Sequence, residues 1–115
     1  MLSQMILAML AAASTMPAAS ELESVFAIRQ DASGITVQVR SNGCTDTSSF
    51  KIHLKENAGK TMIALERERP DYCRAFFRDG VALHWNWNEL GITPPKDLVL
   101  VNPQADGWTA PLRVP

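Results

Sequence analysis

Alternation of apolar and polar residues is the dominant pattern along this chain, and it predicts short β-strands. The clearest run is 35–40, where Ile35, Val37 and Val39 are apolar and the residues between them are polar. A period of two is typical of strands with one face in a core and the other in water. Further strand-like runs, most of them alternating, cover 24–29, 50–55, 61–67, 73–78, 81–87, 98–101 and 108–114; the run at 98–101 is apolar throughout and fits a short buried strand. We therefore expect a mostly β protein, a small antiparallel β-sandwich or barrel of seven to eight short strands.

The runs 50–55 and 61–67 predict a hairpin, because the residues between them carry the turn sequence Asn-Ala-Gly-Lys. Along the second run, alternation places Ile63, Leu65 and Arg67 on the inward face. An unpaired guanidinium at the end of a core is costly, so a carboxylate should hold Arg67.

Two carboxylates are candidates for this partner. Asp71 is the better one, because the turn at Pro70 could bring it back towards Arg67, which predicts a structural ion pair between Arg67 and Asp71. Asp46, just past the first cysteine, is the runner-up.

The run 81–87 allows two interpretations. It places Trp85 and Trp87 on one face, and His84 and Asn86 on the other. In the first interpretation, which we favour, the indoles fill the core and the polar side chains face water. In the second, the Trp85/Trp87 face with His84 and Asn86 binds a glycan or another small ligand.

The N-terminal residues have the pattern of a signal peptide. An apolar run at 5–13 is followed by small residues at 18–20 and then by Glu21. The run is too short to span a bilayer, which takes about 20 apolar residues. We expect residues 1–20 to be removed, leaving one domain at 21–115; the alternative is a buried N-terminal helix of the domain.

Composition narrows the function classes. The formal net charge is −1 with acids and bases interspersed, unlike the basic surface of a nucleic-acid binder. No second apolar segment predicts a membrane span in the mature form. The only two cysteines, Cys44 and Cys73, predict one disulfide in a periplasmic or secreted protein. Closing a loop of 30 residues should stabilise the fold by about 3–4 kcal/mol.

The cysteine region also resembles a known sequence pattern. Gly-Cys-Thr at 43–45, Phe50 and Arg-x-x-Pro-Asp-x-Cys at 67–73 are similar to small exported bacterial proteins of unassigned function. The resemblance covers about a third of the mature chain. It implies a Cys–Cys bridge and an exported domain, and it implies no activity.

Catalytic and metal-binding chemistry find little support. His53 and His84 lack ligand spacing, so we expect no metal and no cofactor. Carboxylates at 66, 68, 71 and 89 could supply a glycosidase pair, but those at 66 and 68 alternate with arginines and fit exposed ion pairs better.

The charged cluster at 66–79 could dock a partner or be a solvated strand end. We expect a non-enzymatic binding or interaction domain, such as an inhibitor or partner of an envelope protein. The alternative function is the small-ligand or glycan binder already described.

Overall fold

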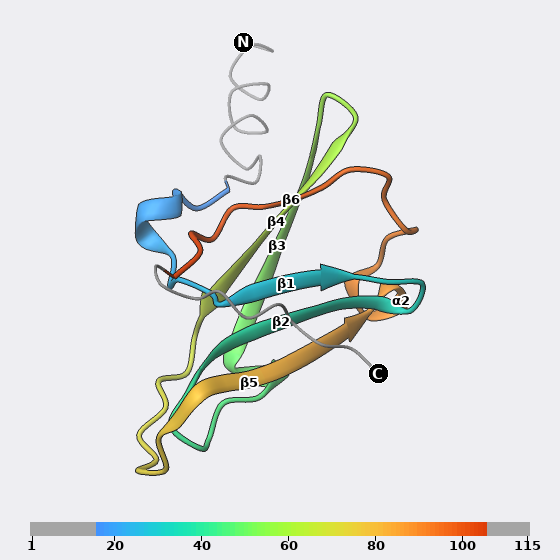
Figure 1. Ribbon diagram of the computed structural model, residues 1–115. Coiled ribbons are helices and arrows are strands. Elements are labelled where there is room, and N and C mark those ends of the chain that lie inside the picture. Colours follow the sequence, from blue (N-terminus) through green and yellow to red (C-terminus); the bar gives the residue numbers. More distant parts are fainter. Residues whose placement is uncertain (1–15, 106–115) are drawn as a thin grey trace, which may run out of the picture.

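The computed structural model describes residues 16–105, which form two three-stranded β-sheets (Figure 1). In chain order the strands are β1 (Ala27–Gln30), β2 (Gly34–Ser41), β3 (Phe50–Asn57), β4 (Lys60–Arg67), β5 (Phe77–Asn86) and β6 (Leu98–Leu100). The helical segments are η1 (Ala19–Glu21), η2 (Thr47–Ser49) and α2 (Trp87–Leu90). One sheet has the order β1-β2-β5 and the other β3-β4-β6. Figure 1 shows β3 and β4 crossing the first sheet steeply.

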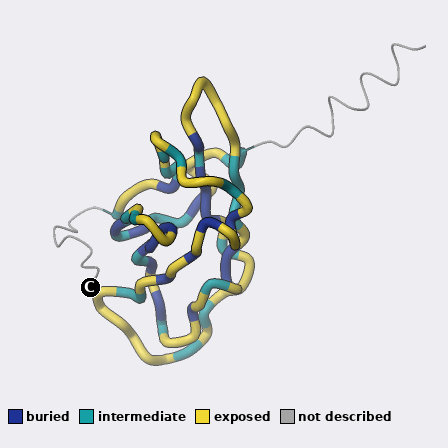
Figure 2. Tube along the Cα trace, turned by 90° about the vertical axis from the view of Figure 1, so that its right-hand side faces the viewer, coloured by how far each residue is buried: buried dark blue, intermediate teal, exposed yellow. Residues whose placement is uncertain are grey.

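The inner faces of both sheets share one core. Ile35, Val37, Ile63 and Leu65 have no solvent exposure, and they belong to one cluster with the indole of Trp85. Figure 2 shows buried stretches in the middle of the fold and exposed ones towards its ends. The predicted inward parities of the runs at 35–40 and 61–67 are therefore confirmed, as is the mostly β fold.

The predicted hairpin is also confirmed. β3 and β4 pair antiparallel from Phe50↔Arg67 to Asn57↔Lys60. The two turn residues, Ala58 and Gly59, both have positive φ, at 53° and 82°. Positive φ at both positions defines the type I′ turn, whose twist matches that of the flanking strands.

The strand count and one pairing differ from the prediction. Residues 16–105 contain six strands, and β6 pairs with β4 in parallel, so the second sheet is mixed. The runs predicted at 73–78 and 81–87 join into β5, which begins only at Phe77. Gly80 does not end the strand: its φ of 72° allows an irregular step while β5 continues along β2. The run predicted at 108–114 lies outside the described residues.

Both ends of the described chain meet at β4. Buried Asn102 accepts a hydrogen bond from the amide of Leu65, and its amide nitrogen donates to the carbonyls of Leu65 and Glu23. Val25 forms a parallel bridge with Gln104 nearby. One asparagine therefore joins the N-terminal segment, the centre of β4 and the segment after β6.

The predicted signal peptide falls mainly on residues 1–15, which lie outside the described part. Of its last residues, Ala19 and Ser20 begin η1. Among the described residues, no helix has the length and apolar character required to cross a membrane.

Candidate functional site

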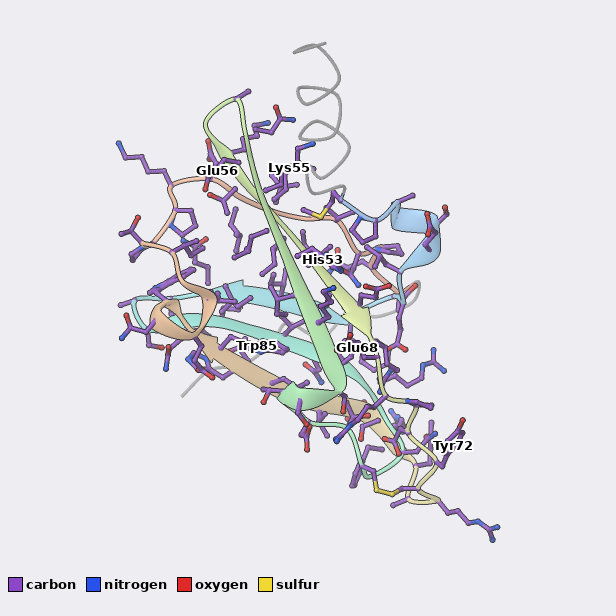
Figure 3. All side chains as sticks on the ribbon, turned by 180° about the vertical axis from the view of Figure 1, so that it is seen from behind. His53, Lys55, Glu56, Glu68, Tyr72 and Trp85 are labelled. Carbon is purple, nitrogen blue, oxygen red and sulfur yellow. A yellow bond between two sulfur atoms is a disulfide. The ribbon has the colours of Figure 1, made fainter. Side chains whose placement is uncertain are left out.

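The disulfide forms between Cys44 and Cys73, as predicted, with 5.7 Å between the Cα atoms. Cys44 follows β2, and Cys73 lies in the connection from β4 to β5. The bond therefore joins two irregular segments that run next to each other at one end of the molecule. Figure 3 shows it beside the labelled Tyr72.

The carboxylate of Asp71 organises both segments. Its Oδ2 accepts hydrogen bonds from the amides of Asn42 (2.7 Å) and Cys44 (3.0 Å) and from the hydroxyl of Thr45 (2.7 Å). Its Oδ1 accepts from the amide of Cys73 (3.1 Å). Partial burial would raise the pKa of Asp71, but these hydrogen bonds outweigh burial and hold the pKa far below its ordinary value.

The prediction that Asp71 pairs with Arg67 is wrong. Arg67 does lie inward, with 16% of its side chain exposed, but its carboxylate partner is Glu23. Nε donates to Oε1 at 2.8 Å and Nη2 to Oε2 at 2.9 Å, a bidentate pair. Asp71 is not free to pair, because its oxygens face backbone amides around the disulfide. The Thr45 hydroxyl lies between the two groups, accepting from Arg67 Nη1 (3.0 Å) and donating to Asp71.

Every N–H donor of the Arg67 guanidinium has an acceptor. Besides Glu23 and Thr45, Nη1 donates to the carbonyl of Arg69 and Nη2 to the carbonyl of Arg40. The guanidinium also lies 4.7 Å from the ring centre of Phe50. Arg67 therefore has no donor left for a ligand, and its role is structural.

The runner-up partner, Asp46, serves a different cation. Its carboxylate caps η2 by accepting from Ser48, and it lies 3.5 Å from Arg69. Both members of that ion pair are more than half exposed.

The cysteine-region pattern gathers in space. Gly43 has φ of 111°, and a Cβ there would approach the Ala75 Cβ to 3.1 Å, which favours glycine. Thr45, Phe50, Arg67 and Asp71 form the contacts described above. The pattern thus describes an architectural unit, whereas the resemblance itself stays a prediction.

The connection from β4 to β5 carries the most exposed aromatic side chains. Tyr72 is 86% exposed, Phe76 71% and Phe77 45%. In residues 16–105 only one other large hydrophobic side chain, Val99, is similarly exposed. Figure 1 shows this connection extending past the ends of both sheets. We call residues 68–77 the display loop.

Hydrogen bonds hold the backbone of the display loop. The amides of Glu68 and Arg69 both donate to the carbonyl of Ser49, and the amide of Ala75 donates to the carbonyl of Asn42 at 2.9 Å. Together with the Asp71 contacts and the disulfide, these bonds fix the loop at several points along its length. The aromatic side chains are therefore exposed on an ordered support.

The predicted ligand face at 84–87 is split between core and solvent. Trp85 and Trp87 are 6% and 7% exposed, which supports the first interpretation. The indole N–H of Trp87 donates to the carbonyl of Ala32. Asn86 caps α2 by accepting from the amide of Glu89. Neither of these two indoles has a face left for stacking on a sugar.

His84 lies on the outer face of the first sheet in a chain of hydroxyl groups. The Ser33 hydroxyl donates to Asp31 (2.7 Å), so it can only accept from His84 Nε2 (3.3 Å). His84 Nδ1 then accepts from the Thr36 hydroxyl (2.9 Å). In this arrangement His84 cannot take a proton from Ser33, so the two residues do not form a nucleophile and its base.

The metal-ligating atoms of the described residues gather only at Cys44, Asp71 and Cys73. The two sulfurs are joined to each other, and the oxygens of Asp71 already accept hydrogen bonds from backbone amides and a hydroxyl group. His53 lies elsewhere, 2.8 Å from Glu66. None of these groups is arranged as a ligand set in the oxidised protein.

At least two hollows indent the surface formed by residues 16–105. One of about 190 Å³ lies beside Glu23, Arg67 and Asp71, whose polar atoms are already bonded. The other, of about 460 Å³, lies between the turn of the β3–β4 hairpin and the segment 91–96. It is open and is lined by Lys96 and by Glu56, which accepts from Thr61.

Comparison with protein-family models, with curated proteins and with solved structures finds no match for this chain.

Sequence reasoning offered the charged cluster at 66–79 as a possible docking surface, but it did not predict the exposed aromatic side chains there, because it placed 73–78 in a strand. The signal available was composition: Tyr72, Phe76 and Phe77 lie within six residues, with a cysteine and an arginine among them.

Proposed function

We propose that this protein is an exported, non-enzymatic binding module that recognises a partner protein through its display loop. The observation that carries this proposal is the exposure of Tyr72, Phe76 and Phe77 on a backbone fixed by hydrogen bonds and a disulfide. Contiguous exposed apolar side chains mark interaction surfaces in small proteins. A prearranged loop also loses less conformational entropy when it binds.

The absence of catalytic arrangement in the described residues supports binding over catalysis. The charged side chains of Asp71 and Arg67 form several hydrogen bonds each, and all of these are made to other residues of the protein. His84 is a donor to Ser33 in its hydroxyl chain. The glycan-binding alternative loses its support, since Trp85 and Trp87 belong to the core.

An exported location is supported by two independent observations. The disulfide is typical of oxidising compartments. The N-terminal sequence has the apolar run and small residues of a signal peptide. Mass spectrometry of the exported protein should find its first residue at Ser20 or Glu21; a retained Met1 in the folded product would contradict export by this signal.

Photo-crosslinking in cells tests the binding surface. Benzoylphenylalanine replaces Phe76 in one variant and Lys55 in a matched control, because Lys55 is exposed on the hairpin at the other end of the molecule (Figure 3). We expect one discrete crosslinked protein from the Phe76 position, competed by unlabelled wild-type protein, and none from Lys55. Equal labelling from both positions would refute a binding surface at the display loop.

A further inference from the structure

We infer that the partner surface bound by the display loop holds a carboxylate between two apolar pockets. This inference rests on the proposed function and specifies the partner's chemistry. Its centre is Arg74, which lies between Tyr72 and Phe76 in the sequence and is exposed.

The backbone contacts of the loop alternate with its exposed side chains. Asp71, Cys73 and Ala75 are the residues bonded to the opposite segment. Asp71 is bonded through its carboxylate, Cys73 through the disulfide and Ala75 through its amide. A chain attached at every second residue presents the residues between on its other side. Those residues are Tyr72, Arg74 and Phe76, so aromatic, cationic and aromatic side chains follow each other in a row.

Arg74 differs from the other arginines of this region. Arg67 is saturated by Glu23 and its other acceptors, Arg69 lies 3.5 Å from Asp46, and Arg78 lies 3.9 Å from Asp79. Within residues 16–105, Arg74 has no hydrogen bond or ion pair.

Within residues 16–105, no acceptor contacts Arg74, so its guanidinium would have no partner there once the flanking rings are covered. The nearest carboxylate in sequence, Asp71, accepts from three backbone amides and a hydroxyl. A guanidinium that loses water on binding needs a charged acceptor, and a carboxylate matches its planar donor geometry. We therefore expect the acceptor to come from the partner.

The composition of the row favours a protein over a lipid surface. Tyrosine, phenylalanine and arginine are enriched in protein interfaces, whereas lysine and glutamate are depleted. Attraction to anionic lipid usually takes a cluster of four to eight basic residues, at about 1 kcal/mol each. The display loop contains two basic residues, Arg69 and Arg74, and no lysine, which is fewer than such a cluster.

The test uses a phage-displayed library of random dodecapeptides selected on the oxidised full-length mature protein. We expect enriched peptides that carry Asp or Glu flanked by apolar residues. Their affinity should fall at least tenfold for Arg74→Glu and for Phe76→Ser, and selection on Arg74→Glu should enrich basic peptides instead. Lys55→Glu is the matched control, because Lys55 is exposed on the hairpin at the other end of the molecule from the display loop, and it should leave the affinity nearly unchanged.

The other outcomes separate the inference from the proposed function. Peptides that need Phe76 but carry no acid would overturn the inference and leave the binding surface intact. Peptides that bind regardless of Tyr72 and Phe76, or no enrichment at all, would overturn both. Binding of the wild-type protein to phosphatidylglycerol vesicles, lost in Arg74→Glu, would assign the row to a lipid surface. A concentration-dependent dimer lost in Phe76→Ser would assign it to a second copy of the chain.

Discussion

Replacing Arg67 by alanine removes five hydrogen-bond donors from one place and leaves the carboxylate of Glu23 without its cation. The perturbation is therefore larger than the loss of one ion pair, because Thr45 and two backbone carbonyls also lose a donor. The ring of Phe50 loses the guanidinium that covers it.

The magnitude follows from the burial of the pair. Breaking a fully buried ion pair costs about 3–5 kcal/mol. Here 16% of the Arg67 side chain and 27% of the Glu23 side chain are exposed, so water can partly solvate the remaining carboxylate. We therefore expect Arg67→Ala to lower the free energy of unfolding by about 2–4 kcal/mol, an effect comparable to that of the disulfide.

Urea unfolding followed by tryptophan fluorescence measures this change, since Trp85 and Trp87 are buried in the folded state. Arg69→Ala is the matched control: its partner Asp46 is exposed, so the midpoint should hardly move. Glu23→Gln should reproduce much of the Arg67→Ala effect, because it removes the same ion pair from the other side. Equal and small shifts for Arg67→Ala and Arg69→Ala would show that Arg67 acts as a surface residue.

Three further predictions concern the same end of the molecule and the first sheet. Reduction by dithiothreitol should lower the free energy of unfolding by about 3–4 kcal/mol, and an unchanged melting temperature would contradict a structural disulfide. The lowered pKa of Asp71 means that the folded state favours its ionised form. The stability that this ionised carboxylate contributes is complete well above the ordinary pKa of 3.8 and is lost as pH falls below that value. Asp71→Asn should therefore reduce the fall in melting temperature between pH 6 and pH 2, and an unchanged fall would refute the assignment. Gly59→Ala should lower the free energy of unfolding by about 1 kcal/mol, because φ of Gly59 is 82° and no atom lies near the added Cβ. Gly80→Ala should lower it clearly more, because the added Cβ would collide with the carbonyl of Val39. Equal urea midpoints for the two variants would contradict the close approach of β5 to β2.

Local pattern predicted the parts of the fold that depend on neighbours in sequence. The β3–β4 hairpin and the inward position of Arg67 follow from period two and one turn sequence. The pairing of Arg67 with Glu23 could not be predicted in this way, because 44 residues separate them and Glu23 stands next to the predicted cleavage site. The parallel pairing of β6 likewise depends on a crossover that periodicity does not encode.

The display loop shows a second limit of periodicity. Residues 73–78 have strand-like composition, yet 73–76 form no strand, because hydrogen bonds to Asn42 and the Asp71 carboxylate replace a ladder. The exposure of Phe76 depends on which segment packs against it, and the alternation of apolar and polar residues does not predict that segment. The candidate site was therefore found from exposure, whereas its support at Cys44 and Cys73 was predicted.

The contacts of the Asn102 side chain affect when this protein can fold during its synthesis. This side chain substitutes for a neighbouring strand by bonding both the amide and the carbonyl of Leu65, and it also bonds Glu23. Until residue 102 has left the ribosome, the buried amide and carbonyl of Leu65 lack these partners, which is costly. Shorter nascent chains should therefore stay unfolded, and such chains are the form that a secretion channel for unfolded polypeptides accepts.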